Sequence, residues 1–325
     1  MMSKVRVGFV GVGGIAAVHL RHISKNPDAK VVAVCDIVEE NARFTGQQYG
    51  ATSYTDFDKM LIDEKLDALF ICVPPFAHGD IEEKAARRGI HLMVEKPVGI
   101  NLESVEKKYE AIKNTDILCA TGYCLRYLDT VAIAKEFLSD KEIAMVRGYY
   151  LTSFVETSWF REMEKSGGQL VEQATHIVDL MRYLGGEIDS VFADMNLQVL
   201  KDISRINIPD VSSINFTFTT GAVGHLDCSL TQPDHRMGIE LIGKGFRVEV
   251  NGTDVTIVEG NKSTTYKSKV DFYEEQDHAF IEAVKTKNKD YILSSYENGL
   301  KTLTVTLAAN TSKEKGKSMR INNVS

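Results

Sequence analysis

The first 120 residues alternate short apolar runs with amphipathic segments, and this alternation constrains the fold more than any other feature of the sequence. Strand signals that alternate with helix signals predict βαβ units and a parallel sheet covered by helices on both faces. Residues 68–73 are apolar throughout, as expected for a strand buried on both sides. We expect strands over residues 5–10, 30–35, 66–73, 90–94 and 117–120, and helices over 15–24, 39–49, 77–88 and 102–113.

The pattern changes after about Gly122. Residues 188–266 are mostly strand-like; Ile214, Phe216 and Phe218 alternate with polar residues, which is the period of a half-buried antiparallel strand. The Gly221 turn then predicts a hairpin. We expect helices over residues 130–138, after the Ser166-Gly167-Gly168 turn, and over 273–285 and 296–312.

Length and pattern together predict two domains in these 325 residues. Residues 1–122 are predicted to form an α/β domain with a doubly wound parallel sheet of the Rossmann type. Residues 123–325 are predicted to form an α+β domain with a mainly antiparallel sheet.

Charge and cysteine content exclude several classes of protein. The net charge is −7, from 38 basic and 45 acidic residues, so no general attraction for nucleic acid or for anionic membranes is expected. No run of 18 apolar residues predicts a membrane span. The odd number of cysteines and the absence of a C-x-x-C pair indicate reduced thiols, and hence a cytoplasmic protein. The five are Cys35, Cys72, Cys119, Cys124 and Cys228.

A glycine-rich turn follows the first predicted strand and opens the first helix, the context that a dinucleotide-binding fingerprint requires. Residues 11–16 fit G-x-G-x-x-A. Gly11 permits the tight turn, Gly13 lets the backbone approach a pyrophosphate, and Ala16 keeps the helix close to the strand. Gly14 and Ile15 begin the helix, whose free N–H groups would meet the phosphates. A glycine turn without a ligand is the alternative.

Asp36 ends the second predicted strand, 25 residues after Gly11. A carboxylate near this spacing accepts hydrogen bonds from ribose hydroxyls and repels a 2′-phosphate. Ile37 and Val38 follow it instead of a basic residue, so we expect NAD in preference to NADP. The alternative is an aspartate that caps the helix over residues 39–49.

Two further motifs follow predicted strands of the first domain. Pro74, Pro75 and His78 come after one strand, and Glu95 and Lys96 come after the next. Ligands of doubly wound sheets bind at the carboxyl ends of the strands, so we expect these residues on the cofactor side. Taken alone, a solvated surface lysine is the more ordinary interpretation of Lys96.

In the second domain, Glu172, His176 and Asp179 are spaced to share one face of a helix. Carboxylates beside a histidine fix its tautomer and raise its basicity, as removal of an alcohol proton requires. Gln173 and Asp179 are candidates for binding neighbouring substrate hydroxyls. A histidine whose hydrogen bonds are satisfied within the helix is the alternative.

Two residues before this helix are weaker candidates for substrate binding. Trp159 would stack on a sugar or pack within its domain. Arg126, next to the domain boundary, would contact substrate or, more in keeping with its place, brace the junction. No metal site is expected, since His19 and His22 have no ligand partner at a zinc-like spacing.

The motifs GVGGIA, VPPFAH, EKP, GYCLRY and GG-x-x-x-E-x-x-x-H-x-x-D together resemble the glucose-fructose oxidoreductase/inositol dehydrogenase/rhizopine catabolism (Gfo/Idh/MocA) family over essentially the whole chain. In that family the EKP lysine contacts substrate and nicotinamide ribose, and the helix histidine is the general acid/base. The resemblance implies these roles for Lys96 and His176. The family often has Asp where this chain has Glu172, and glycines where it has Ala174 and Gln169. These departures bear on the substrate rather than on the fold.

The resemblance implies an NAD(P)-dependent oxidoreductase acting on a sugar, cyclitol or sugar derivative, with one active site between the domains. It also implies an open second sheet that supports homodimers or homotetramers. Two other functions stay open. One is an NAD-using glycosidase that oxidises its sugar transiently, and the other is a non-catalytic dinucleotide-sensing regulator. The presence of both Lys96 and His176 argues against the regulator.

Overall fold

The structure is a computed structural model that describes residues 4–321. The chain forms two compact units. Unit 1 comprises the residues up to Cys124 together with Asp271–Leu300, and unit 2 comprises Leu125–Val270 together with the residues from Lys301 onward. The sequence-based division at residue 122 therefore differs from the structure in the segment Asp271–Leu300, which returns to unit 1.

Within residues 4–321, unit 1 contains a six-stranded sheet in the order β3-β2-β1-β4-β5-β6, with all neighbouring pairs parallel. This is the doubly wound order, in which the winding reverses between β1 and β4 and ligands bind at their carboxyl ends. The elements of unit 1 are β1 (Val5–Val10), α1 (Gly14–Lys25), β2 (Ala29–Cys35), α2 (Glu39–Tyr49), β3 (Thr52–Tyr54), α3 (Phe57–Asp63), β4 (Ala68–Ile71), η1 (Pro75–Ala77), α4 (Ile81–Ala86), β5 (His91–Val94), α5 (Leu102–Lys113), β6 (Cys119–Thr121), α10 (Phe272–Thr286), η4 (Lys289–Tyr291) and the start of α11 (Tyr296–Lys315).

Apolar packing explains why α10 belongs to unit 1. Phe9 of β1 stacks on Phe70 of β4 with ring centroids 4.7 Å apart, and Phe280 of α10 meets Phe70 edge-on at 5.5 Å. Ile281 and Val284 extend the same buried cluster. Moving α10 away would return these side chains to water, at about 1.5–3 kcal/mol for each large one.

Two local expectations for unit 1 were incomplete. The helix expected over residues 77–88 is divided into η1 and α4, because Gly79 between them has a φ of +52°, which a continuing helix does not allow. Neither β3 nor α3 was predicted from the sequence. Two of the three side chains of β3 are exposed, so this strand lacks the apolar run that identifies the others.

The described part of unit 2 contains a nine-stranded sheet in the order β14-β13-β12-β11-β7-β10-β9-β8-β15. Its described pairs are antiparallel except β10 with β7, which confirms the mainly antiparallel sheet. The remaining elements are η2 (Cys124–Tyr127), α6 (Asp129–Leu138), β7 (Ile143–Leu151), η3 (Ser158–Arg161), α7 (Met163–Ser166), α8 (Gln169–Glu172), α9 (Thr175–Gly185), β8 (Ile188–Asn196), β9 (Val211–Phe218), β10 (Val223–Ser229), β11 (Arg236–Gly243), β12 (Phe246–Asn251), β13 (Asp254–Glu259), β14 (Lys262–Tyr266) and β15 (Met319–Arg320).

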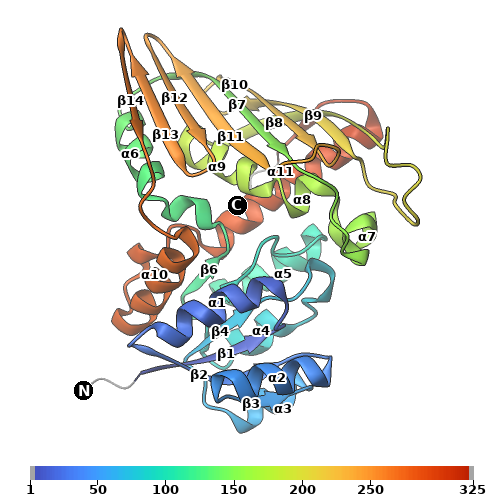
Figure 1. The fold of residues 1–325 in the computed structure, drawn as a ribbon, viewed down its shortest axis with the longest axis vertical. Helices are drawn as coiled ribbons and strands as arrows, with labels where there is room; N and C mark the ends of the chain where they lie inside the picture. The colour runs from blue at the N-terminus through green and yellow to red at the C-terminus, as the bar shows by residue number, and fades with distance from the viewer. Residues whose placement is uncertain (1–3, 322–325) are drawn as a thin grey trace. The chain divides into compact units, whose positions relative to one another are not determined.

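Helix α9 packs on one face of this sheet, against β7 and β11 (Figure 1). The approach is close at Gly148 of β7, where a Cβ would stand only 3.0 Å from the Cγ2 of Ile177. Along β10 the buried residues Leu226 and Cys228 alternate with more exposed ones such as Asp227, as the period of two predicts. The predicted hairpin at Gly221, whose φ is +89°, joins β9 to β10 and is confirmed.

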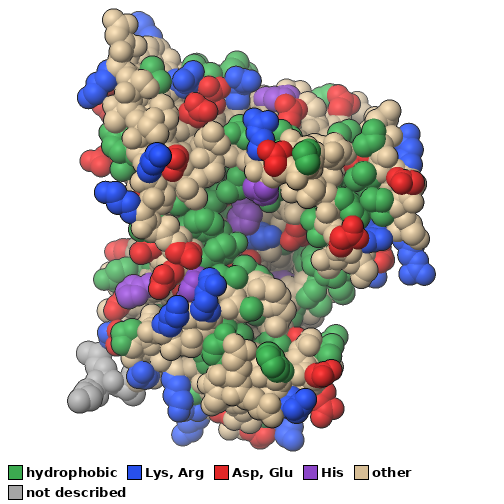
Figure 2. Space-filling model, in the orientation of Figure 1, with side chains coloured by type: hydrophobic (Ala, Val, Ile, Leu, Met, Phe, Trp, Pro, Cys, Tyr) green, Lys and Arg blue, Asp and Glu red, His purple; other side chains and the backbone are tan. Residues whose placement is uncertain are grey.

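The surface carries both signs of charge. Lysine and arginine side chains are interspersed with aspartate and glutamate on the face that Figure 2 shows. Among residues 4–321, no helix is long and apolar enough to cross a membrane.

Candidate active site

The turn between β1 and α1 leaves open space beside its glycines. Gly11 has a φ of +78°, and a Cβ there would lie 2.7 Å from the carbonyl oxygen of Cys72, so this position requires glycine. At Gly13 and Gly14, by contrast, no heavy atom of the described chain lies within 4 Å of the Cβ position. These two residues are exposed, whereas Ala16 is buried and holds α1 against the sheet. A pyrophosphate fits the space that the missing side chains leave.

The start of α1 also has the electrostatic properties that a phosphate needs. Gly13 is the N-cap and provides no side-chain acceptor, and the first turn contains no acidic residue. The first N–H groups of a helix lack partners within it and carry partial positive charge. Backbone donors from Gly14 and Ile15 onward are therefore available to bind an anion.

Asp36 is held by two backbone donors at the end of β2. Its Oδ2 accepts a hydrogen bond from the N–H of Val12 at 3.0 Å, and its Oδ1 accepts one from the N–H of Val38 at 2.9 Å. An ionised carboxylate has about four acceptor sites, so capacity remains for ribose hydroxyls. The capping alternative is not supported, because Val38 is the N-cap of α2 and no side chain caps it. The next residue, Ile37, is 93% exposed and presents an apolar side chain beside Asp36.

The motif after β4 places His78 in the interior of unit 1. Its Nδ1 lies 2.5 Å from Oε1 of Glu82, whose Oε2 accepts a hydrogen bond from Nζ of Lys108 at 3.0 Å. Burial alone would raise the pKa of Glu82, but His78 and Lys108 lower it. Pro75 is buried and Pro74 partly so. The expected contacts of Pro74, Pro75 and His78 with the cofactor remain predictions.

The loop after β5 is organised around Glu95, a buried carboxylate. Its Oε2 accepts a hydrogen bond from the backbone N–H of Lys96 at 3.1 Å. Gly122 lies directly against it, since a Cβ there would stand 2.7 Å from the Cδ of Glu95. The peptide bond between Lys96 and Pro97 is cis. Lys96 itself is half-buried at the carboxyl edge of the sheet.

Sequence reasoning missed His19 as part of this arrangement. Its Nε2 lies 3.0 Å from Oε1 of Glu95, and its Nδ1 lies 2.7 Å from Oδ1 of Asp277 on α10. No partner at a zinc-like spacing marks His19 as a metal ligand, and no sequence motif assigns it another role. No local signal identifies this partner, because Asp277 is 258 residues away in the chain.

In unit 2, the sequence predicts that the candidate residues of the GG-x-x-x-E-x-x-x-H motif share one continuous helix. The structure differs, because this segment is divided into two helices, α8 and α9. Glu172 ends α8, and His176 lies in the first turn of α9. The N–H of His176 donates to the carbonyl oxygen of Gln173 at 3.3 Å, and the N–H of Ala174 reaches back to Gln169. The spacing of four between Glu172 and His176 is therefore not the helical one. The Oε1 of Gln173 is buried and has no hydrogen-bond partner within residues 4–321.

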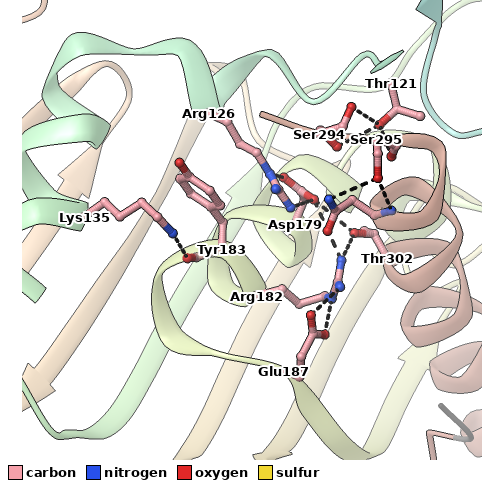
Figure 3. Close-up of polar contacts among 11 residues, drawn as sticks. Thr121, Arg126, Lys135, Asp179, Arg182, Tyr183, Glu187, Ser294, Ser295 and Thr302 are labelled. Carbon is pink, nitrogen blue, oxygen red and sulfur yellow. Dashed lines mark hydrogen bonds and ion pairs between the residues drawn. The ribbon is translucent and has the colours of Figure 1, made fainter. Parts of the chain in front are cut away.

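Asp179 and Arg126 form a buried ion pair in unit 2 (Figure 3). The Nε and Nη2 atoms of Arg126 each donate to Asp179 at 2.8 Å, and Oγ1 of Thr302 donates to its Oδ1 at 3.1 Å. Asp179 is 2% exposed and Arg126 5%. With three hydrogen bonds already accepted, the Asp179 carboxylate has little capacity left. This pairing argues against the expected substrate contacts of both residues and favours a bracing role.

The aromatic and cationic neighbours reinforce this brace. The guanidinium of Arg126 lies over the ring of Tyr183, 4.5 Å from its centroid, and Nζ of Lys135 lies 3.6 Å from the same centroid. Burial, with the nearby charge of Arg126, lowers the pKa of Lys135. Arg182 pairs with Glu187 at 2.8 Å. Figure 3 also shows a separate contact of unit 1, in which the hydroxyls of Thr121 and Ser294 are 2.7 Å apart.

Trp159 is partly buried against an apolar cluster of unit 2. The cluster consists of Phe160, Ile208 and Leu230, and the ring of Phe160 meets Trp159 edge-on with centroids 6.4 Å apart. This placement favours the packing interpretation of Trp159 over sugar stacking.

Comparisons with known proteins cover both units. The model of an oxidoreductase family with an NAD-binding Rossmann fold (GFO_IDH_MocA) matches residues 5–123, and the model of the GFO/IDH/MocA C-terminal domain matches residues 140–258. The chain is 26% identical to a myo-inositol 2-dehydrogenase of Thermotoga maritima, over 98% of this chain and 99% of that protein. It is 29% identical to a scyllo-inositol 2-dehydrogenase (NAD(+)) of Bacillus subtilis, over 80% and 75%.

A solved structure of a levoglucosan dehydrogenase in complex with NADH and L-sorbose has the same fold. It aligns with a TM-score of 0.91 over 99% of this chain and 100% of that one, at 19% sequence identity. The likeness extends over both the Rossmann sheet and the second sheet.

Proposed function

Because the chain belongs to the Gfo/Idh/MocA family of NAD-binding oxidoreductases, we propose that it is an NAD-dependent dehydrogenase of a sugar, a cyclitol or a sugar derivative. The observation that carries the proposal is the open cradle at Gly13 and Gly14, at the free end of α1 and next to the fixed carboxylate of Asp36. The names of the relatives, two of which are inositol dehydrogenases, support the substrate class.

The preference for NAD over NADP rests on Asp36. Its two oxygens are fixed by the N–H groups of Val12 and Val38, and this side chain cannot turn away without breaking both bonds. A 2′-phosphate at this position would meet a carboxylate, with no arginine or lysine among the next two residues to compensate.

In the proposed reaction, bound NAD supplies the hydride acceptor, and the residues of this chain handle the alcohol. Lys96 donates a hydrogen bond from its ammonium to the reacting oxygen, which lowers the cost of forming an alkoxide-like transition state. His176 accepts the hydroxyl proton as general base. The role of Glu172 as the group that orients His176 is proposed from the sequence motif and not from helical spacing, since α8 ends at Glu172. Gln173, whose buried Oε1 lacks a partner among the described residues, binds a neighbouring hydroxyl.

The test is a spectrophotometric screen for NADH formation over myo-inositol, scyllo-inositol, glucose 6-phosphate, levoglucosan and aryl glycosides, with NAD and NADP in parallel. We expect turnover on at least one polyol or sugar, and faster turnover with NAD. Release of the aryl group without net NADH would support the glycosidase instead. Binding of NAD without turnover on any compound would support the regulator.

Location and assembly complete the proposal. All five cysteines are free and buried, which supports a reducing cytoplasm.

The exposed face of the nine-stranded sheet carries polar side chains such as His225 and Asp227, which suits a wet interface in a homodimer or homotetramer. Light scattering after size-exclusion chromatography measures the oligomeric state directly, and a mass of one chain would exclude this assembly.

A further inference from the structure

His19 is fully buried with a carboxylate at each ring nitrogen. Nδ1 lies 2.7 Å from Asp277 and Nε2 lies 3.0 Å from Glu95. A neutral imidazole has one N–H and one acceptor nitrogen, so one of the two contacts would set two acceptors against each other. Carboxylates at both nitrogens therefore require the imidazolium form, in which both nitrogens donate.

The surrounding groups preserve this charge. His22, one turn along α1, places its Nδ1 3.2 Å from the second oxygen of Asp277. The ring of Tyr273 meets His19 edge-on at 6.0 Å, and Phe70 of β4 covers another side at 5.4 Å. Burial alone would lower the pKa of His19, but Asp277 and Glu95 raise it to about 10.

Two further groups near this cluster also bear on its protonation. The thiol of Cys72 faces Glu95 and Asp277, and burial together with these charges raises its pKa well above the usual range, so it stays neutral. Lys96, the residue after Glu95, is the nearby cation on the cofactor side of the sheet.

The cluster connects α1 to the backbone of Lys96. One oxygen of Glu95 binds His19 and the other accepts the N–H of Lys96. The N–H of Glu95 donates to Ile71 of β4 at 2.9 Å, and Gly122 packs against the carboxylate. The Glu95 side chain is thus enclosed, and the orientation of its second oxygen depends on the bond that His19 makes with the first.

We propose that His19 is a positioning residue for the reaction: anchored by Asp277, its imidazolium fixes the carboxylate of Glu95, which in turn fixes the backbone of Lys96 and presents the Lys96 ammonium to the reacting oxygen. The proposal rests on the proposed function for the role of Lys96. The charge of the His19 imidazolium also neutralises the carboxylate of Glu95.

The first experiment compares His19→Gln with His22→Gln in the full-length chain, using the best substrate of the screen. Glutamine retains hydrogen bonding at position 19 but not the charge. The matched control removes a neighbouring buried histidine that contacts Asp277 and not Glu95. For His19→Gln we expect kcat to fall about 10- to 100-fold, as for other displaced catalytic groups, with NAD affinity within about twofold. His22→Gln should lose less than about threefold.

The pH profile separates positioning from general structural damage. Without the imidazolium, the unneutralised charge of Glu95 stabilises the protonated form of Lys96, so the high-pH limb of the kcat profile should move to higher pH in His19→Gln. The limb of His22→Gln should coincide with that of the wild type. Equal losses in both variants, with unshifted profiles, would overturn the proposal.

The second experiment needs no substrate, so it separates failure of this inference from failure of the proposed function. Nitrogen NMR of histidine-labelled wild-type protein should show His19 as an imidazolium at about pH 8.5, about two units above the ordinary histidine pKa. That signal should vanish in His19→Gln and persist in His22→Gln. If every imidazole is neutral at that pH, His19 is not the proposed cation.

Should His19→Gln fail to fold, Asp277→Asn serves in its place. This variant keeps the ring and the shape of its partner but removes one of the two charges that hold the proton. The imidazolium signal should then be lost at about pH 8.5, near two units above the ordinary value. Its unchanged persistence would contradict the role of Asp277 as the anchor.

Discussion

Each unit places a buried carboxylate beside a candidate catalytic residue, but a different cation neutralises it. In unit 1, Glu95 precedes Lys96 and pairs with His19. In unit 2, Asp179 follows His176 by one turn of α9 and pairs with Arg126. Histidine loses its proton within the accessible pH range, whereas arginine does not. The comparison teaches that two ion pairs of similar burial have different dependences on pH.

The largest effects should come from the two candidate catalytic residues themselves. Lys96→Ala and His176→Ala should each lower kcat by about 10²–10⁴, the range for groups that handle a proton in the transition state. NAD binding, measured by fluorescence, should persist in both. The exposed residues Lys113 and His278 provide matched controls, and alanine there should leave kcat unchanged. Full activity of either variant would show that the substituted residue, Lys96 or His176, is not catalytic.

Removal of the buried carboxylate in unit 2 should cause the largest decrease in the free energy of unfolding. Asp179→Ala leaves Arg126 charged, buried and unpaired, at a cost of about 3–5 kcal/mol in the free energy of unfolding. Urea denaturation measures this cost. Glu103→Ala is the control, because both side chains of its pair with Lys107 are exposed, so the loss of this pair should leave the free energy of unfolding nearly unchanged. Similar costs for the two variants would show that burial does not distinguish these ion pairs.

The pH dependence of stability should separate the two clusters directly. The pKa of His19 rises from 6.5 to about 10 on folding, so the native state binds the proton more tightly than the unfolded state. Its contribution is complete below about pH 6.5 and is lost as the pH rises towards 10, with a slope of at most about 1.4 kcal/mol per pH unit. Urea denaturation between these limits should show this decline in the wild type.

The same decline should be absent from His19→Gln and present in Asp179→Ala. Arginine stays protonated over this range, so Arg126 releases no proton and adds no pH dependence to the free energy of unfolding. A wild-type stability that is flat over the window would contradict the charged state of His19.

The smallest effect on stability should come from a glycine that is open to a ligand. Gly13→Ala adds a Cβ where no described heavy atom lies within 4 Å, at a φ of −75° that alanine accepts, so stability should change by less than about 0.5–1 kcal/mol. NAD affinity should nevertheless fall about tenfold, which corresponds to about 1.4 kcal/mol. The matched change in unit 2, Gly148→Ala, meets the Cγ2 of Ile177 at 3.0 Å and should destabilise the unit without a specific effect on NAD.

A thermal scan with and without NAD distinguishes the two glycine variants. Gly13→Ala should keep its apo melting temperature and lose the increase on adding NAD. Gly148→Ala should lower the apo value and keep the increase. The reverse pattern would show that the open space at Gly13 is not a ligand site.

The sequence predicted the elements that have a local signal. The bounds of α2 and α5 agree with the structure at both ends, because apolar residues at helical spacing are bounded by recognisable breaks. The glycine turn was equally visible, since a positive φ at Gly11 and open space at Gly13 are properties of the residue type. The short exposed strand β3 was missed because its stability comes from pairing with β2 rather than from its own side chains.

The interruption between α8 and α9 could not be predicted from spacing. Residues 169–185 contain no proline, and their apolar pattern continues across Gln173 and Ala174. The break is set by backbone hydrogen bonds: the carbonyl oxygen of Ala174 accepts hydrogen bonds from the N–H groups of both Ile177 and Val178. A spacing of four residues places two side chains together only when the helix between them is unbroken.

By itself, the sequence determined the doubly wound sheet, the position of the dinucleotide turn and the identities of Lys96 and His176 as candidates, because each depends on residues close together in the chain. Only the tertiary structure decided the partners of the buried charges. Asp277 reaches His19 across 258 residues, and Arg126 meets Asp179 across 53. Burial makes an unpaired charge costly, so the fold must supply a partner, but the cost does not specify from which part of the chain that partner comes.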